Sequence, residues 1–294
     1  MRELTWDELL KGLDATLDLC RGLGLQEAVA ESRFMKHRAR LASLNDRLRA
    51  GGQEAALELY DTDRLSHIVA LTEVGELASI EPFLQACDPP TLYPKLRDAL
   101  AGPVLPNEED TNSNRARNIL FELNLASKLW RAGITSTLGE EPDLSCTLDD
   151  IHFLIHCKRA FSATGAKGCI DRARAQLKRD LKKAPKLAQG IIALSVSRLI
   201  NTGDRVLFFK GEANGRKALK RRLFVATTSI KQSWAKSDAS VQGIIFHAIT
   251  PAFDKETRLL VVQQLTHGYG LVSKGSSDSG HLRSLFDRLR EIWH

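Results

Sequence analysis

Apolar residues recur at helical spacing through the first hundred residues. From residue 6 to residue 17 they lie three or four positions apart, and ESRFMKHRARLASLNDRL and LSHIVALTEVGELASIEPFL continue the pattern. Gly51-Gly52 and Asp88-Pro89-Pro90 interrupt it, and the stretch 101–114 is polar and proline-bearing. We therefore predict two regions: an all-helical N-terminal region over 1–105, suited to interaction or oligomerisation, and a second domain over 106–294.

The pattern changes after residue 114. RARNILFELNLASKLWRAG predicts a helix that ends at Gly133, and short apolar runs predict strands around 134–138, 143–148 and 151–158. A basic helix over 166–184 and a buried strand over 190–200 complete the order helix, three strands, helix, strand. Further on, 221–234 is ambiguous, 241–250 and 258–267 extend the sheet as a pair, and 279–294 is an amphipathic helix.

Asp149-Asp150 has the position of a two-residue hairpin turn. Counting outward pairs Leu148 with Ile151 and brings Asp143 opposite His156. Alternation then gives a core face and a polar face that only Leu154 interrupts. The predicted core face holds Leu144, Cys146, Leu148, Ile151, Phe153, Ile155 and Cys157, and the predicted polar face holds Asp143, Ser145, Thr147, His152, His156 and Lys158.

Glu122 falls inside the apolar arc of the predicted helix 115–133, whereas Asn124, Ser127, Lys128 and Arg131 lie opposite. A carboxylate turned toward the interior is costly without a partner such as a metal ion or a cation. Two interpretations stay open for Glu122: a ligand in an internal site, or a salt bridge at the helix surface.

These residues together resemble the PD-(D/E)XK, or restriction-endonuclease-like, nucleases. The resemblance covers residues 115–198, in which the element order matches the core of that family. Pro142-Asp143 matches the first half of its motif, and His156-Cys157-Lys158-Arg159 resembles the second half with histidine in the acidic position. Glu122 matches the helix glutamate of many members, and Gln176 resembles a polar residue that often points toward the site. The resemblance implies an α/β fold with a restriction-endonuclease-like core.

The same resemblance implies a nuclease that hydrolyses DNA phosphodiester bonds with Mg²⁺ or Mn²⁺. Glu122, Asp143, His156 and the backbone carbonyl of Cys157 would hold the ion, and Lys158 would be the catalytic cation. Because imidazole suits Mn²⁺ better than Mg²⁺, His156 favours manganese. Two alternatives remain: a degenerate module that binds nucleic acid or a protein partner without cleavage, and an accidental likeness in which His156 is an ordinary surface residue.

The charge of the chain is divided unevenly. Residues 1–100 hold 12 lysines and arginines against 17 acidic residues, a net charge of −5, and the remainder holds 30 against 19, a net charge of +11. Such an excess favours a polyanionic partner, and the aromatic content of 6% argues against a single-strand stacking platform. We therefore expect duplex DNA as the partner, bound by Arg159, Arg172, Arg174, Gln176, Lys178, Arg179, Lys182, Arg216, Lys217, Lys220 and Arg221.

Other features narrow the class of protein. No run of eighteen apolar residues and no secretory signal are present, so we expect a cytoplasmic protein without a membrane partner. The five cysteines are widely spaced and contain no Cys-x-x-Cys pair, which predicts buried thiols. Phosphate-loop, serine-elbow and zincin motifs are missing. The N-terminal helices are candidates for a homodimer contact. As the biological role of such a nuclease, we expect defence or restriction.

Overall fold

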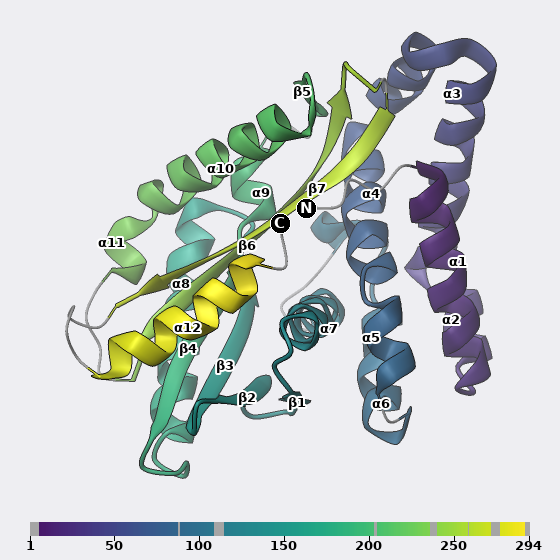
Figure 1. The fold of residues 1–294 in the computed structure, drawn as a ribbon. Helices are drawn as coiled ribbons and strands as arrows, with labels where there is room; N and C mark the ends of the chain where they lie inside the picture. Colours follow the sequence, from purple (N-terminus) through teal and green to yellow (C-terminus); the bar gives the residue numbers. More distant parts are fainter. Residues whose placement is uncertain are drawn as a thin grey trace.

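The computed structural model describes residues 6–87, 89–108, 115–202, 205–235, 240–257, 259–271 and 277–291. They form an α/β structure in which a mixed sheet lies between two layers of helices (Figure 1). The part of the predicted boundary over 109–114 lies outside these residues. The division at residue 105 stays a prediction, and one hydrophobic core runs from the N-terminal helices to the sheet.

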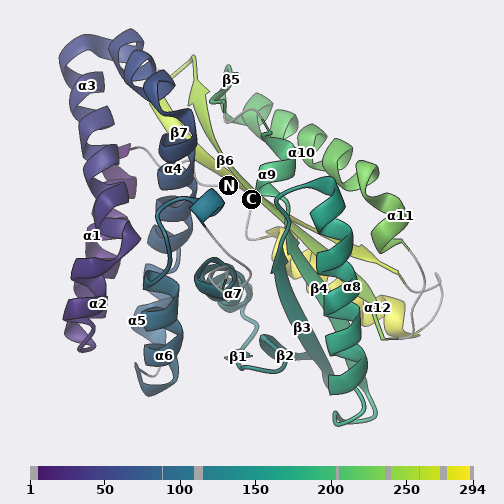
Figure 2. The same ribbon diagram turned by 180° about the vertical axis from the view of Figure 1, so that it is seen from behind.

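The N-terminal region is helical, as its spacing predicts. Gly52 interrupts the third helix with a φ of 72°. The helices stand beside the sheet in Figures 1 and 2. Their bounds are α1 (Trp6–Gly22), α2 (Gln26–Glu31), α3 (Arg33–Thr62), α4 (Arg64–Ala78), α5 (Glu81–Ala86) and α6 (Pro89–Leu100), followed by the short η1 (Pro106–Glu108).

The predicted order of helix, three strands, helix and strand is present. It comprises α7 (Arg115–Arg131), β1 (Ser136–Leu138), β2 (Leu144–Leu148), β3 (Ile151–Arg159), α8 (Ala163–Asp180) and β4 (Ala188–Ser195). After it come α9 (Ser197–Ile200), β5 (Leu207–Phe209), α10 (Glu212–Ser229), α11 (Lys231–Trp234), β6 (Gly243–Asp254), β7 (Leu259–Gly270) and α12 (Ser277–Glu291). The sheet order is β1-β2-β3-β4-β6-β5, and β7 pairs with β6.

The predicted strand range 190–200 extends five residues too far at its end, because the chain leaves the sheet after Ser195 and forms α9. The ambiguous segment 221–234 is helical. The expected pair of long strands is present as antiparallel β6 and β7. The five cysteines are free thiols; Cys20, Cys146, Cys157 and Cys169 are buried as predicted, whereas Cys87 is half-buried.

The β2–β3 hairpin has the predicted register. Leu148 pairs with Ile151 and Leu144 with Ile155, and the strands are antiparallel. The turn residues Asp149 and Asp150 have φ values of 50° and 63°, the left-handed geometry that a two-residue hairpin turn requires. The turn therefore determines which β3 side chains share a face with Lys158.

The expectation of one apolar and one polar face on β3 is wrong. α8 covers the second face, and Leu154 packs there with Ala166, Ile170 and Ala173. His156, expected on the open face, is completely buried. Because β3 and β4 are parallel, their crossover helix lies against the sheet and leaves both faces covered. The apolar set beginning with Leu144 forms a core face, as predicted, and it lies on the side of α7.

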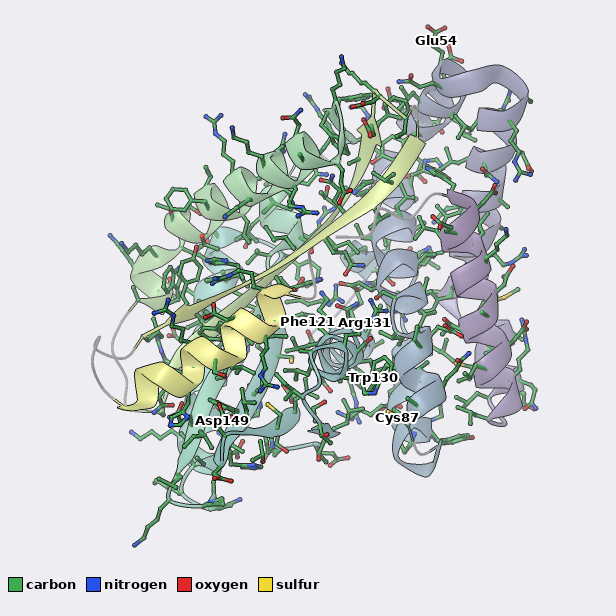
Figure 3. The ribbon with its side chains drawn as sticks, viewed as in Figure 1. Glu54, Cys87, Phe121, Trp130, Arg131 and Asp149 are labelled. Carbon is green, nitrogen blue, oxygen red and sulfur yellow. The ribbon has the colours of Figure 1, made fainter. Side chains whose placement is uncertain are left out.

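α7 lies between the N-terminal helices and the sheet, so both of its sides are buried. Phe121 stacks on His247 of β6 with ring centroids 5.3 Å apart, and Trp130 contacts Phe83 of α5 at 6.3 Å (Figure 3). The side that the sequence places opposite the apolar arc packs against α4. Its members Asn124, Ser127 and Lys128 are all buried, whereas Arg131 is exposed and donates to the carbonyl of Ser79.

Buried ions join the two regions. Glu73 of α4 accepts from Arg33 of α3 and from Arg117 of α7, each at 2.5 Å. Burial alone would raise the pKa of Glu73, but the two guanidinium groups outweigh it and hold the pKa well below its usual range. Next to this triad, Arg159 at the end of β3 pairs with Glu76 and donates to the carbonyl of Arg117. α4, α7 and β3 are therefore linked by charged groups that are largely buried.

The buried triad yields a stability prediction. Replacing Glu73 by glutamine removes the buried carboxylate that Arg33 and Arg117 share, so we expect Glu73→Gln to lower the free energy of unfolding by about 3–5 kcal/mol. The control is Asp14→Asn, which removes the partner of Arg38 from a partly exposed pair at 2.6 Å and is expected to cost less than about 1 kcal/mol. Guanidinium unfolding of both variants measures the difference, and equal small losses would contradict it.

Candidate functional site

A pocket of about 460 Å³ opens where α6, α7 and the start of β2 meet the end of β3. The structure brings together here four of the residues that the sequence singled out. These are Glu122 from α7, Asp143 before β2, and Cys157 and Lys158 from β3; the remaining lining residues are Lys95, Arg115, Asn118, Ile119, Glu140 and Glu141.

The loop before β2 positions Asp143. Gly139 donates its backbone N–H to the carbonyl of Asp143 at 3.1 Å. A Cβ at residue 139 would lie 2.6 Å from the carbonyl oxygen of Pro142, so this tight approach requires glycine. The loop thereby places the carboxylate of Asp143 beside β3.

The described contacts of Asp143 all use Oδ2. This oxygen accepts from the backbone N–H of Cys157 at 2.7 Å and from Nζ of Lys158 at 3.4 Å. Burial alone would raise the pKa of Asp143, but the contact with His156 and the charge of Lys158 outweigh it and hold the pKa below its ordinary value. Asp143 is therefore a carboxylate at neutral pH, with a lysine beside it.

Glu122 is buried in the pocket wall, and its partner is a cation from the N-terminal region. Lys95 of α6 lies 2.6 Å from Oε2 of Glu122. Even so, burial first and the negative charge of Asp143 second raise the pKa of Glu122 to about 7. The ion pair with Lys95 offsets these effects only in part. Glu122 therefore changes its protonation state near neutral pH, as catalytic carboxyl groups often do.

His156 does not line the pocket. Its Nε2 lies 2.7 Å from Oδ2 of Asp180 at the end of α8, and its Nδ1 lies 3.3 Å from Oδ2 of Asp143. The second contact is at ion-pair distance but is out of line for a hydrogen bond. Both ring nitrogens therefore face carboxylates, and the imidazole bridges Asp143 to α8 from behind.

The predicted nucleic-acid contacts occupy different environments. Arg159 is half-buried and paired with Glu76, and Arg174 is also half-buried and donates to the carbonyl of Trp234. Gln176 is also half-buried, and it lies outside the pocket lining. The exposed members are Arg172, Lys178 and Arg179 on α8, Lys182 in the turn after it, and Lys217, Lys220 and Arg221 on α10, where Arg216 is half-buried and paired with Glu212.

Sequence reasoning missed two residues of this arrangement, Lys95 and Asp180. Lys95 lies on a helix whose apolar spacing says nothing about a partner 27 positions later. Asp180 sits inside a strongly basic segment, and an isolated acid at the buried end of a basic helix was the available signal.

Comparison of the chain with protein-family models, with curated proteins and with solved structures finds no match. None of the described helices combines the length and the apolar character that crossing a membrane requires. Within the described residues, no group of three or more His, Cys, Asp and Glu side chains is arranged to hold a metal ion. The pocket itself offers two close carboxylates, Glu122 and Asp143.

The raised pKa of Glu122 gives a pH-dependent stability prediction. Its pKa is about 7 in the folded chain against an ordinary value of 4.5, so the folded state binds the proton more tightly. Glu122 therefore lowers the free energy of unfolding as pH rises through this interval. We expect Glu122→Gln to be more stable than the wild type by about 1–3 kcal/mol at pH ~8 and nearly unchanged at pH ~5.

Guanidinium unfolding at the two pH values measures this effect. Glu140→Gln is the matched control, because Glu140 lies on the exposed rim of the same pocket, and we expect little change at either pH. An equal effect of Glu122→Gln at both pH values would show that Glu122 does not titrate in this interval.

Proposed function

We propose that this pocket hydrolyses phosphodiester bonds of nucleic acid, with duplex DNA as the preferred substrate and Mg²⁺ or Mn²⁺ as the cofactor. One observation carries the proposal: Glu122 from α7, Asp143 from the loop before β2 and Lys158 from β3 line a single pocket. Their order along the helix, three strands, helix and strand supports a restriction-endonuclease-like core.

The charge of the pocket supports a requirement for a divalent cation. Lys95, Arg115 and Lys158 stand against four lining carboxylates, Glu122, Glu140, Glu141 and Asp143, so the fully ionised pocket has a net charge of −1. A phosphodiester, which is itself an anion, is poorly attracted to such a pocket. A bound dication would reverse the sign of the pocket and make the entry of a phosphate favourable.

The donor atoms fit a hard, oxygen-ligated ion. Oδ2 of Asp143 and Oε2 of Glu122 are engaged by protein donors, whereas no described contact uses the other oxygen of either carboxylate. These two oxygens would hold Mg²⁺ or Mn²⁺, which retain several waters when few side chains bind them. Because both ring nitrogens of His156 face carboxylates, the geometry removes the reason for a preference for Mn²⁺.

Each chain residue then has a chemical role. Asp143 stays ionised and holds Lys158 beside the phosphate, where the ammonium group stabilises the negative charge that develops during hydrolysis. Glu122, with Lys95 on its other side, completes the negative pocket. When bound, the ion would polarise the phosphate and lower the pKa of an attacking water.

A second candidate function is binding of nucleic acid without cleavage. The observation that favours it is the 2.6 Å contact between Lys95 and Glu122, which gives the buried carboxylate a protein counter-ion. If this pair persists when nucleic acid binds, Glu122 has no free charge to offer, and the exposed cations of α8 and α10 become the functional surface.

Cleavage of supercoiled and linear duplex DNA in EDTA, Mg²⁺ and Mn²⁺ tests the proposal. We expect cleavage with either metal and none in EDTA. Asp143→Asn and Lys158→Met are each expected to reduce the rate by about 100-fold or more, the usual effect of removing a group that stabilises developing charge.

Two variants with matched charge changes serve as controls. Asp150→Asn lies in the exposed turn of the same hairpin, and Lys36→Met lies on the exposed surface of α3, so both should cleave like the wild type. DNA bound in a salt-sensitive manner but uncut with both metals, by the wild type and by Lys95→Ala, would reject catalysis in favour of the binding function.

A further inference from the structure

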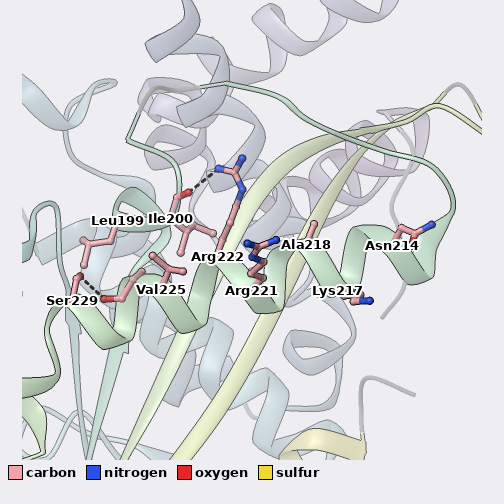
Figure 4. A pocket seen from close by; sticks show the side chains of 10 residues that line it. Leu199, Ile200, Asn214, Lys217, Ala218, Arg221, Arg222, Val225 and Ser229 are labelled. Carbon is pink, nitrogen blue, oxygen red and sulfur yellow. Dashed lines mark hydrogen bonds between the residues drawn. The ribbon is translucent and has the colours of Figure 1, made fainter.

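A second pocket, of about 700 Å³, runs as a groove along α10 with α9 as its other wall (Figure 4). Lys217, Arg221 and Val225 succeed one another at four-residue intervals and form one side. Leu199 and Ile200 of α9 form the other. Arg222 donates from Nη1 to the carbonyl of Ile200 at 3.2 Å, so a hydrogen bond joins the two walls.

One half of this α9–α10 groove is positively charged. Neither Lys217 nor Arg221 has an ion-pair partner in the part of the chain that the structure describes, and both side chains are exposed. The neighbouring Arg216, in contrast, is paired with Glu212 at 2.8 Å. Uncompensated cations that share one wall of a groove favour an anionic ligand, and phosphate is an anion that both arginine and lysine bind through charged hydrogen bonds.

The other half of the groove is apolar. Leu199, Ile200 and Val225 line it, and Val225 is 61% exposed with the 63% exposed Phe224 beside it. Adjacent exposed apolar side chains are typical of a binding surface. From Arg221 to Val225 the helix rises by about 6 Å, so one small ligand can contact both halves with an anionic group and an apolar ring.

The groove lies at the same edge of the sheet as the candidate site. β3 and β4 are parallel, and Lys158 and Arg159 pair with Leu194 and Ser195. α9 begins two residues after β4 ends. It therefore lies at the carboxyl ends of the parallel strands, where β3 also places Lys158. Ligands of α/β proteins bind at this edge of the parallel strands.

We infer that the α9–α10 groove binds a phosphorylated nucleotide unit, with its phosphate on Lys217 and Arg221 and its base against Leu199, Ile200 and Val225. The unit is either a free nucleotide or one residue of a strand that extends from the candidate site. The inference rests on the proposed function in the second case alone, because binding of a free nucleotide requires no hydrolysis.

Titration calorimetry with the full chain in EDTA tests the inference while any metal-dependent reaction is absent. The ligands are deoxyadenosine monophosphate, the nucleoside without phosphate, inorganic phosphate and a short single-stranded oligonucleotide. We expect the nucleotide, the oligonucleotide or both to bind more tightly than the nucleoside or phosphate. Binding of the free nucleotide identifies a nucleotide site, and binding of the oligonucleotide alone identifies a strand site.

Variants test both halves of the groove. Lys217→Ala and Arg221→Ala should each weaken binding by about tenfold or more, the effect of losing a charged hydrogen bond, and Val225→Asp should weaken it as well. Lys36→Ala and Arg47→Ala make the same charge changes on the exposed surface of α3 and should leave affinity unchanged. Because EDTA removes any divalent cation, the groove is tested independently of cleavage.

Three results would overturn the inference. The first is binding of neither the nucleotide nor the oligonucleotide. The second is affinity for inorganic phosphate equal to that for the nucleotide, which would leave a simple anion site. The third is an equal loss of affinity in the groove variants and in the α3 controls, which would show that the loss reflects the overall charge of the protein and not the groove.

Discussion

The pairing of Glu73 with Arg33 and Arg117 is the interaction on which the rest of the structure depends. It places an arginine from α3 and one from α7 on a single carboxylate of α4, and a buried charge of this kind tolerates little displacement. Arg159 extends the network to β3 through Glu76 and the carbonyl of Arg117. Since Lys158 directly precedes Arg159 and Glu122 shares α7 with Arg117, this interior network also determines where the pocket residues lie.

Within the pocket, neighbouring groups set the two carboxylates to different states. Asp143 has donors on its Oδ2 and a depressed pKa, whereas burial and the charge of Asp143 raise the pKa of Glu122 to about 7. The contrast arises from placement: Glu122 is buried in the wall of the pocket, whereas Asp143 lies beside β3 and accepts from its backbone. An acid held ionised beside one that titrates near neutrality is an arrangement suited to hydrolysis.

Local periodicity predicted the elements from α7 to β3 well, because a two-residue turn and a glycine-terminated helix leave few alternatives. The register of the hairpin and the proximity of Asp143 to Lys158 followed from counting. Periodicity could not reveal what covers an element, so the polar positions on β3 and on α7 gave no sign that α8 and α4 cover them. Pairs distant in sequence, such as Lys95 with Glu122, leave no periodic signal.

The origin of Lys95 in α6 determines which piece of this chain can act as a unit. A fragment that began at residue 106 would retain Glu122, Asp143 and Lys158, but its buried glutamate would lose its counter-ion and α7 would lose the helices that shield one side. Recombination, truncation or fusion at that point would therefore transfer the motif without its electrostatic environment. The chemistry of the pocket belongs to both regions together.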